Sequence, residues 1–297
     1  MQPCFKGVTL AVLGGDSREV ILSRSLAAAG AIVRTVGLPE DDYPGIESRP
    51  DLPSALEGVQ AVILPVPGIN DRGEVHLAFA GPPIILSAPL LAALPAGTPV
   101  LVGAAREGLR QMAAELGLRL VEVLKRDEVA IHNSIPSAEG AIQIAMEKTP
   151  ITIHGSRSLV LGFGRTGLTL AGKLKALDSS TAVVARNPAQ RARAVAMGME
   201  AYNFNAFVIE AASADFLFNT VPAMVIDQQV LKKLSKAALI VDLASSPGGT
   251  DFEEAQRLGI KAVLAPGLPG KVAPVTAGKI LADVVPGILA EELQGRY

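Results

Sequence analysis

Short apolar runs alternate with helix-forming segments along the whole 297-residue chain, and this alternation constrains the fold more than any other feature. Short apolar runs suit buried parallel strands, and a crossover helix must connect each strand to the next. The pattern predicts strands at residues 9–13, 32–36, 61–64, 84–86, 100–102 and 120–124, and then at 158–162, 181–185, 216–220, 239–242 and 261–264. We therefore expect an α/β fold with doubly wound parallel sheets.

The alternation restarts near residue 158, so the chain contains two copies of one architecture. We expect two Rossmann-like domains with a cleft between them: an N-terminal domain over 1–140 and an NAD(P)-binding domain over 141–276. The apolar helical segment 277–297 follows the second set of strands. We expect this segment to return to the first domain and complete it.

Composition excludes several classes of protein. Hydrophobic residues make up 49% of the chain and charged residues 19%, which is enough to bury a large core. The net charge of −2 argues against a nucleic-acid binder, and no apolar run is long enough to span a membrane. Cys4 is the only cysteine, so disulfides and metal centres built on several thiolates are excluded. We expect a cytoplasmic protein without a metal site.

The most specific motif is a glycine-rich loop between an apolar strand and a helix. It reads Gly162, Phe163, Gly164, Arg165, Thr166 and Gly167, with G-x-G-x-x-G spacing. Gly162 permits a tight turn, Gly164 lets the backbone approach a pyrophosphate, and Gly167 allows close packing of the helix on the strand. The motif predicts a dinucleotide site, and the alternative is a glycine-rich turn without a ligand.

The end of the next predicted strand carries Arg186 and Asn187 where dinucleotide-binding domains usually have an acidic residue. An arginine cannot accept hydrogen bonds from ribose hydroxyls, but it binds a 2′-phosphate through charge-assisted hydrogen bonds. The sequence therefore favours NADP over NAD. In the alternative interpretation, Arg186 is an exposed loop charge and the cofactor is NAD.

Two further strand ends are expected at the same edge of the sheet. They supply Asn219, Thr220, Val221 and Pro222 after one strand, and Asp242, Ala244 and Ser245 after another. Ligands of doubly wound sheets lie beyond the carboxyl ends of the strands, so we expect these residues to line the cofactor, with Thr220 and Ala244 near the nicotinamide ribose. The alternative is ordinary turn chemistry.

The corresponding first turn of the N-terminal domain, residues 14–18, lacks the full glycine pattern, so a second dinucleotide is not expected. This turn can present N–H groups and Arg18 to a carboxylate, or Asp16 or Ser17 can simply cap the helix that follows.

A run of potentially catalytic side chains, residues 125–134, precedes a predicted connecting helix. Ser134 or Ser137 would cap this helix, Glu139 would lie in its first turn, and it would continue over 141–148. His132 lies in this run, and its ordinary pKa suits proton transfer near neutral pH. A structural or surface role is the alternative for this histidine.

Five segments of the chain together resemble the A subunits of bacterial dipicolinate synthase. They are residues 14–16, 126–139, 162–167, 242–251 and 265–270. The glycine-rich loop is common to many dehydrogenases, whereas the 126–139 segment and the Pro-Gly-Gly-Thr-Asp sequence at 247–251 are more particular. The resemblance extends over nearly the full chain.

The resemblance implies a dehydrogenation, with loss of water, that converts 4-hydroxy-tetrahydrodipicolinate into dipicolinate. Arg186 favours NADP as the coenzyme of this reaction. The resemblance also implies a partner chain, the flavoprotein-like B subunit, together with a branch from lysine biosynthesis and synthesis in the mother cell of a sporulating bacterium. A homodimer remains open.

Such a substrate carries two carboxylates and loses a hydroxyl group, so it needs cationic partners and proton-transfer groups. The catalytic candidates are Arg126, Asp127, His132 and Glu139. The substrate-binding candidates are Arg18, Ser134 and Lys271. Two alternatives remain: a non-catalytic chain that binds nucleotide or serves as a scaffold in that complex, and an NAD(P)-dependent hydroxyacid or amino-acid dehydrogenase.

Overall fold

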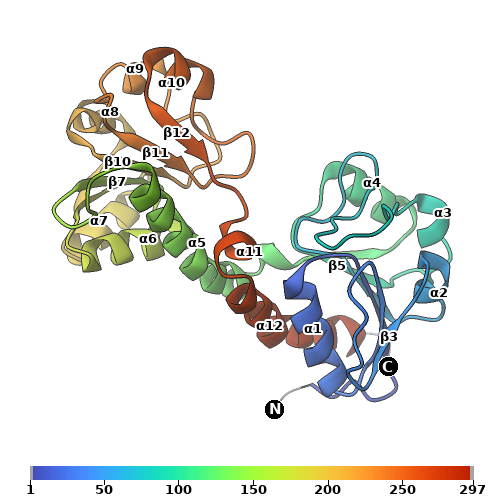
Figure 1. Cartoon of the computed structure of the whole chain (residues 1–297). Coiled ribbons are helices and arrows are strands. Elements are labelled where there is room, and N and C mark those ends of the chain that lie inside the picture. Colours follow the sequence, from blue (N-terminus) through green and yellow to red (C-terminus); the bar gives the residue numbers. More distant parts are fainter. Residues whose placement is uncertain (1–2, 295–297) are drawn as a thin grey trace. The chain divides into compact units, whose positions relative to one another are not determined.

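The computed structural model describes residues 3–294, and its contacts divide the chain into two compact units (Figure 1). The first unit comprises Met1–Val129 and Pro274–Tyr297, and the second comprises Ala130–Ala273. Each unit is built around a sheet of its own. Within the described residues, no helix is both long enough and apolar enough to cross a membrane.

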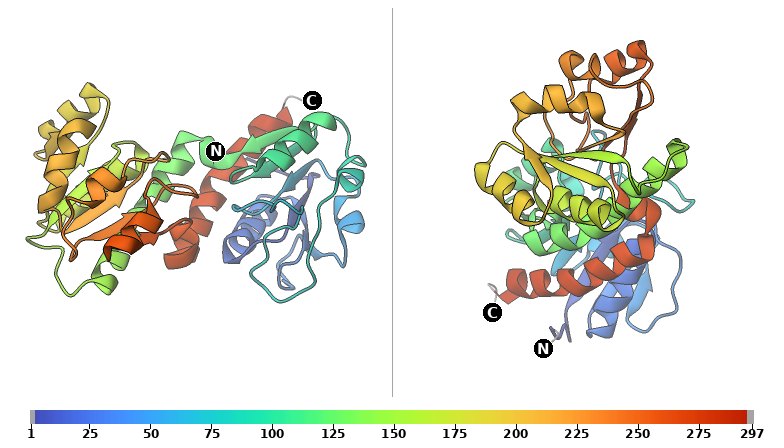
Figure 2. Two further views of the ribbon diagram at one scale, coloured as in Figure 1. Left: turned by 90° about the horizontal axis from the view of Figure 1, so that it is seen from above. Right: turned by 90° about the vertical axis from the view of Figure 1, so that its left-hand side faces the viewer.

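Six parallel strands form the sheet of the first unit, in the order β3-β2-β1-β4-β5-β6 (Figures 1 and 2). The strands are β1 (Thr9–Leu13), β2 (Ile32–Val36), β3 (Ile46–Ser48), β4 (Ala61–Ile63), β5 (Pro99–Val102) and β6 (Arg119–Glu122). The helical segments are α1 (Ser17–Ala28), α2 (Leu52–Leu56), α3 (Ala88–Leu91), α4 (Glu107–Glu115), the 3-10 turn η1 (Val123–Lys125) and α12 (Pro274–Gln294).

The central strand β1 buries side chains on both of its faces. Leu10 and Val12 pack in a cluster with residues of α1 and α12, whereas Ala11 and Leu13 pack with residues of α2, α3 and α4. Successive side chains of a strand point to opposite faces, so a strand that is covered on both faces is apolar throughout. This explains the uninterrupted apolar runs in the sequence.

Helix α12 packs closely against α1 within the first unit. A Cβ atom on Gly278 would lie 2.7 Å from Ile21 Cδ1 and 3.1 Å from the Cα atom of Arg18. The absence of a side chain at Gly278 therefore sets how closely the two helices approach.

The second unit repeats the plan with six parallel strands in the order β12-β11-β10-β7-β8-β9. The strands are β7 (Arg157–Leu161), β8 (Ser180–Val184), β9 (Glu200–Tyr202), β10 (Phe216–Asn219), β11 (Leu239–Asp242) and β12 (Lys261–Leu264). The helical segments are α5 (Asp127–Lys148), which begins in the first unit, α6 (Arg165–Ala176), α7 (Pro188–Ala196), α8 (Phe204–Glu210), η2 (Ala211–Ser213), α9 (Gln228–Leu231), α10 (Phe252–Leu258) and α11 (Leu268–Val272).

This sheet is also covered on both faces. Val160 packs with residues of α5, α6 and α7, whereas its neighbours Leu159 and Leu161 pack with residues of α8, α9 and α10. The prediction of an α/β fold with two Rossmann-like, doubly wound parallel sheets is confirmed.

One predicted strand is wrong. Residues 84–86 join neither sheet; Ile85 forms an isolated antiparallel bridge with Glu74. Ile84 and Leu86 are buried, but they bond to an earlier part of the same connection from β4 to α3, where the Val75 N–H donates to the Ile84 carbonyl at 2.8 Å. Their apolar character reflects burial beneath this connection, which a strand pattern does not distinguish from burial in a sheet.

The predicted start of the connecting helix is also wrong. Helix α5 begins at Asp127, so Ser134 and Ser137 lie inside it and cap nothing. Their hydroxyl groups donate to the carbonyl oxygens of Ile131 and Asn133, at 2.6 and 2.7 Å. A serine that bonds back to its own helix in this way is accommodated in the helix interior and does not mark its beginning.

Candidate functional site

A hollow of about 470 Å³ lies beyond the carboxyl ends of β7, β8 and β10 in the second unit. It is lined by Gly162, Phe163, Gly164, Arg165, Thr166, Ala185, Arg186, Asn187, Gln190, Phe204, Thr220, Val221 and Pro222. From β7 the chain continues to β8 and β9 on one side of β7 and then returns to β10 on the other side of β7, so the strand order switches direction at β7. The hollow, called the β7–β8 hollow below, lies at this switch point. Ligands of doubly wound sheets bind at this position.

Two glycines of the 162–167 loop are required by packing. Gly162 has a φ of +89°, and a Cβ atom there would lie 2.4 Å from Thr220 Oγ1. A Cβ atom on Gly167 would lie 2.1 Å from the carbonyl oxygen of Gly162. These two positions therefore allow the tight turn and bring helix α6 onto the strand.

The third glycine, Gly164, has a different role. It occupies the N-cap position of α6, where no side chain caps the helix, and a Cβ atom on it would meet nothing within 4 Å. Because Gly164 lines the β7–β8 hollow, its missing side chain leaves space for a ligand rather than for protein atoms. An open helix N-terminus favours a phosphate group, so the loop fits the pyrophosphate of a dinucleotide.

The equivalent turn in the first unit is closed by its own side chains. Asp16 accepts a hydrogen bond from the Arg18 N–H at 2.9 Å, and Glu19 Oε2 accepts one from the Asp16 N–H at 2.8 Å. The N–H of Gly15 donates to the His76 carbonyl at 2.8 Å. Of the two sequence interpretations, the structure supports capping, because these N–H groups are already bonded.

The loop after β8 carries the residues predicted to select the cofactor. Arg186 is exposed, and Asn187 caps α7 by accepting a hydrogen bond from the Ala189 N–H at 2.8 Å. Arg191, which the sequence analysis did not single out, donates from Nη1 to the carbonyl oxygens of Ala185 and Arg186 at 2.8 and 2.7 Å. No aspartate or glutamate is among the described residues that line the hollow.

Phe204 and Gln190 also line the β7–β8 hollow and were missed by the sequence analysis. Phe204 begins α8 and meets the buried Phe207 edge to face, with ring centroids 6.3 Å apart. The available signal was an aromatic residue two positions after the short edge strand β9, but that strand was itself not predicted.

The strand ends divide into residues that line the hollow and residues that support it. Thr220, Val221 and Pro222 line it, and Thr220 Oγ1 donates to the Leu161 carbonyl at 2.8 Å. Asn219 is fully buried and accepts a hydrogen bond from the Val221 N–H at 3.0 Å. It therefore shapes the turn beneath the lining.

Asp242 is fully buried as well, and four donors surround its carboxylate. They are Asn219 Nδ2 at 2.9 Å, the Ala244 N–H at 3.0 Å, the Gly249 N–H at 2.8 Å and Thr250 Oγ1 at 2.7 Å. Ala244 is buried and Ser245 exposed, and neither lines the β7–β8 hollow. These contacts indicate that Asp242 holds the 244–250 segment in its conformation.

The catalytic candidates do not form one cluster. Arg126 is ion-paired with Glu291 of α12. Asp127 and His132 are exposed on α5, whereas Glu139 accepts a hydrogen bond from Lys173 Nζ at 2.9 Å. His132 and Glu139 share one face of the helix, about 10 Å apart along its axis.

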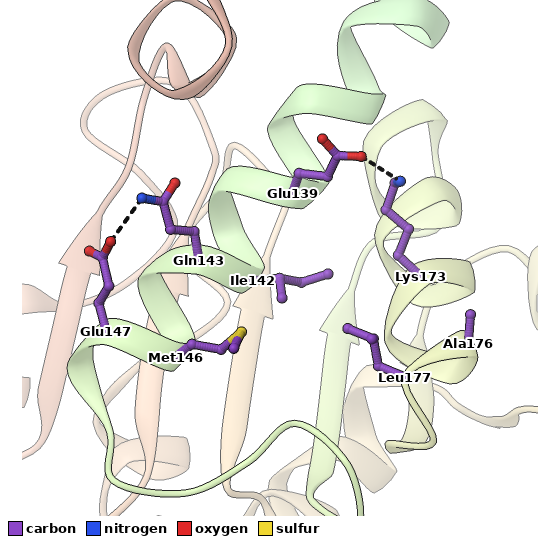
Figure 3. A pocket seen from close by; sticks show the side chains of 8 residues that line it. All are labelled: Glu139, Ile142, Gln143, Met146, Glu147, Lys173, Ala176 and Leu177. Carbon is purple, nitrogen blue, oxygen red and sulfur yellow. Dashed lines mark hydrogen bonds and ion pairs between the residues drawn. The ribbon is translucent and has the colours of Figure 1, made fainter.

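Glu139 and Lys173 belong to a groove of about 600 Å³ between α5 and α6 (Figure 3). Its floor is formed by Ile142, Met146 and Leu177. The lining of this groove shares no residue with that of the β7–β8 hollow.

The substrate-binding candidates have different surroundings. Arg18 is buried and forms two hydrogen bonds from Nε and one from Nη2 to the carboxylate of Asp16, the closest at 2.8 Å. Ser134 is buried within 2.6 Å of Thr169 Oγ1, where it joins α5 to α6. Lys271 is exposed near the end of α11.

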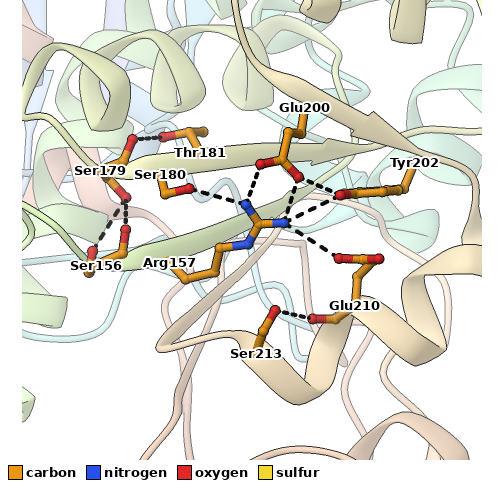
Figure 4. Close-up of polar contacts among 9 residues, drawn as sticks. All are labelled: Ser156, Arg157, Ser179, Ser180, Thr181, Glu200, Tyr202, Glu210 and Ser213. Carbon is orange, nitrogen blue, oxygen red and sulfur yellow. Dashed lines mark hydrogen bonds and ion pairs between the residues drawn. The ribbon is translucent and has the colours of Figure 1, made fainter.

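A dense polar network lies at the opposite, amino-terminal edge of the second sheet (Figure 4). Arg157 binds Glu200 through two hydrogen bonds of 2.7 Å, and it also reaches Tyr202 and Glu210. The hydrogen bonds from Arg157 and Tyr202 lower the pKa of Glu200 to about 2. The hydrogen bond with Glu200 in turn raises the pKa of Tyr202. The network ties the first residues of β7 and β9 together.

Comparisons with known proteins agree with this division of the chain. Residues 9–124 match the family described as the N-terminal domain of the dipicolinate synthase A chain. Residues 124–247 match the NAD-binding domain of the D-isomer specific 2-hydroxyacid dehydrogenases. The second match identifies the ligand class of this region as a nicotinamide dinucleotide, which the open helix N-terminus at Gly164 fits.

Full-length relatives narrow the assignment. The A subunit of dipicolinate synthase from Bacillus subtilis is 39% identical over 292 residues, covering 96% of this chain and 97% of that protein. The crystal structure of its counterpart from Bacillus halodurans superposes with a TM-score of 0.94 at 38% identity, covering 97% of this chain and 99% of the other. The transhydrogenase of Sinorhizobium meliloti, at 14% identity, a TM-score of 0.69 and coverages of 96% and 95%, shares the fold. The chain therefore belongs to the family of dipicolinate synthase A subunits, whose second domain is of the NAD-binding dehydrogenase type.

Proposed function

We propose that this chain is the dehydrogenase component of a dipicolinate synthase and that it binds its coenzyme in the β7–β8 hollow. The observation that carries the proposal is the uncapped start of α6 at Gly164, at the switch point of the sheet. A pyrophosphate placed there accepts hydrogen bonds from helix N–H groups at the positive end of the helix dipole.

The proposed coenzyme is NADP. Arg186 is exposed at the end of β8, and the described lining contains no carboxylate that would repel a 2′-phosphate. Arg191 binds the carbonyl oxygens of the same loop and so holds Arg186 in place. A guanidinium group pairs with a phosphate through charge-assisted hydrogen bonds, which a ribose hydroxyl cannot equal.

The proposed reaction converts 4-hydroxy-tetrahydrodipicolinate into dipicolinate, with loss of one water molecule and two hydrogens. When bound, the nicotinamide coenzyme supplies the hydride acceptor. The residues of the chain must hold two carboxylates, remove a proton and protonate the departing hydroxyl group.

The candidates for these tasks whose side chains are exposed are Asp127, His132, Glu139 and Lys271. We assign proton transfer to His132, with Asp127 and Glu139 on the same helix, and carboxylate binding to Lys271 and Arg126. To bind a carboxylate of the substrate, Arg126 must first release Glu291, its ion-pair partner. Ser134 and Arg18 are assigned to positioning, because their polar atoms already bind Thr169 and Asp16.

A partner chain completes the proposal. The relatives are named as A subunits, which supports a complex with a second chain. We propose that this second chain is the flavoprotein-like B subunit. Dipicolinate then forms in the assembled complex.

The test is calorimetric titration of the full chain with NADP and with NAD, alone and with the B subunit. Gly164→Val places a side chain in the β7–β8 hollow and should weaken coenzyme binding by about tenfold or more. Gly172→Val is the matched control, because a Cβ atom at this position on the same helix also meets nothing within 4 Å but Gly172 does not line the hollow. Absence of binding in the unmodified chain under all four conditions would refute the proposal.

A further inference from the structure

A second hollow, of about 500 Å³, lies in the first unit and is formed mainly by the long connection from β4 to α3 (blue-green in Figure 1). Its polar lining consists of Asn70, Glu74, His76 and Arg106, and Phe79 contributes an aromatic wall. This β4–α3 hollow contains none of the residues assigned above to the coenzyme, to catalysis or to the substrate.

The β4–α3 hollow lies at the carboxyl edge of the first sheet. From β1 the chain proceeds to β2 and β3 on one side and returns to β4 on the other, so the switch point lies between β1 and β4. The connection after β4 lines the hollow, and Arg106 follows β5. The hollow therefore lies beside this switch point, beyond the ends of β4 and β5. Ligands of doubly wound sheets bind beyond the carboxyl ends of the strands.

The wall of the hollow is fixed to the end of β1. The Gly15 N–H donates to the His76 carbonyl at 2.8 Å, and the Ala78 N–H donates to the Gly15 carbonyl at 3.0 Å. These two bonds use both main-chain groups of Gly15. The connection therefore occupies the place where a phosphate would approach the turn, and the hollow favours a ligand without phosphates.

The polar lining combines cationic and acceptor groups. The Arg106 guanidinium is 55% exposed and lies 3.1 Å from Asp71, which is 85% exposed. Such a surface ion pair is weak, so a ligand carboxylate can replace Asp71. His76 is exposed as a second donor. Glu74 accepts a hydrogen bond from Asn70 Nδ2 at 2.7 Å and offers a carboxylate to a hydroxyl or ring N–H.

We propose that the β4–α3 hollow binds a small ring molecule that carries carboxylates and a hydrogen-bond donor. Arg106 and His76 pair with its carboxylates, Glu74 accepts its donor group, and Phe79 packs against its ring. The identity of this ligand as the substrate or product of the enzyme rests on the proposed function. The hollow then gives the first unit a binding site for the acid that is separate from the carboxylate contacts proposed above for Lys271 and Arg126.

The experiment is calorimetric titration of the full chain with dipicolinate in metal-free buffer, with pyridine as the probe that lacks carboxylates. Arg106→Gln should weaken dipicolinate binding by about tenfold to a hundredfold, because it removes one charge-assisted interaction. Arg72→Gln is the matched control, since this exposed arginine of the same connection does not line the hollow. Asp71→Asn removes the competing carboxylate and should strengthen binding by about twofold or more.

Dipicolinate binding that is absent from the unmodified chain, or equal in the Arg106→Gln and Arg72→Gln variants, would overturn the assignment. NADP titration of the same variants separates the two proposals, because Arg106 is remote from Gly164 in sequence and lies in the other unit. If the unmodified chain binds dipicolinate normally but binds no coenzyme, the proposed function is refuted and acid binding in the β4–α3 hollow is still supported. If the chain binds coenzyme but no dipicolinate, the coenzyme site is still supported and acid binding in the β4–α3 hollow is refuted.

Discussion

Asn219 and Asp242, the last residues of neighbouring strands β10 and β11, are joined by a side-chain hydrogen bond of 2.9 Å in the core of the second unit. Both residues are fully buried. The amide of Asn219 also binds the turn that contains Val221, and the carboxylate of Asp242 binds the segment that ends at Thr250. One buried contact thus fixes two loops at the carboxyl edge of the sheet.

Replacement of Asp242 by alanine should therefore destabilise the second unit. Four donors would lose their common acceptor, and each buried unpaired group costs about 1–3 kcal/mol before water or relaxation compensates it. We expect a net loss of about 3 kcal/mol in the free energy of unfolding, measured by denaturant titration. Ser245→Ala, an exposed neighbour, should change it by less than about 0.5 kcal/mol.

Replacement of Arg186 by alanine tests the coenzyme preference. The affinity for NADP should fall by about tenfold to a hundredfold, because a charge-assisted partner of the 2′-phosphate is lost, whereas the affinity for NAD should stay the same. Both are measured by calorimetric titration. Arg193→Ala removes an exposed arginine of α7 that does not line the β7–β8 hollow, and it should change neither affinity. Equal losses for both coenzymes would contradict NADP selection.

The Arg157–Glu200 pair should make stability depend on acid pH. The pKa of Glu200 is lowered to about 2 in the folded protein, from a reference value of 4.5, so the folded state holds this proton less tightly than the unfolded state. The stabilisation is present above about pH 4.5 and is lost as the pH falls towards 2. Because the Glu200 side chain is 50% exposed, we expect at most about 1 kcal/mol.

The measurement compares the free energies of unfolding of the unmodified chain and Glu200→Gln across this pH range. Their difference should be largest at neutral pH and shrink towards pH 2. Glu253→Gln, at an exposed carboxylate of α10, serves as the control and should show a smaller difference at neutral pH. A Glu200→Gln difference that does not change with pH would show that the pair contributes no charge-dependent stability.

Two glycines of α12 should respond in opposite ways to substitution. Gly278→Val would force side-chain atoms into Ile21 and the backbone at Arg18, and should lower the stability of the first unit by about 1–3 kcal/mol. A Cβ atom on Gly287 meets nothing within 4 Å, so Gly287→Ala should raise stability by about 0.5–1 kcal/mol through helix propensity. Thermal unfolding of both variants checks the prediction, and a stable Gly278→Val variant would disprove the close helix contact.

Much of the site could be located from the sequence because its signals are local. The strand before Gly162, the glycine spacing and the helix after it are all read within one short segment, and the structure places that segment at the switch point of a sheet. The roles of Asn219 and Asp242 could not be read this way. A polar residue at a strand end looks the same whether it points into a hollow or beneath it.

The sequence by itself determined the alternation of strands and helices, the doubly wound class of both sheets and the glycine loop, because each depends on neighbours along the chain. Only the tertiary structure decided which of the two strand-to-helix turns, residues 14–18 leading into α1 or residues 162–167 leading into α6, leaves its helix start open to a ligand. In the first unit, Asp16 and Glu19 close the helix start and His76 arrives from a distant connection, whereas Gly164 leaves the start of α6 uncapped. The capping bonds of Asp16 and Glu19 are local, so the sequence could suggest them. The bond between Gly15 and His76 joins residues far apart in the chain, and no local pattern records it.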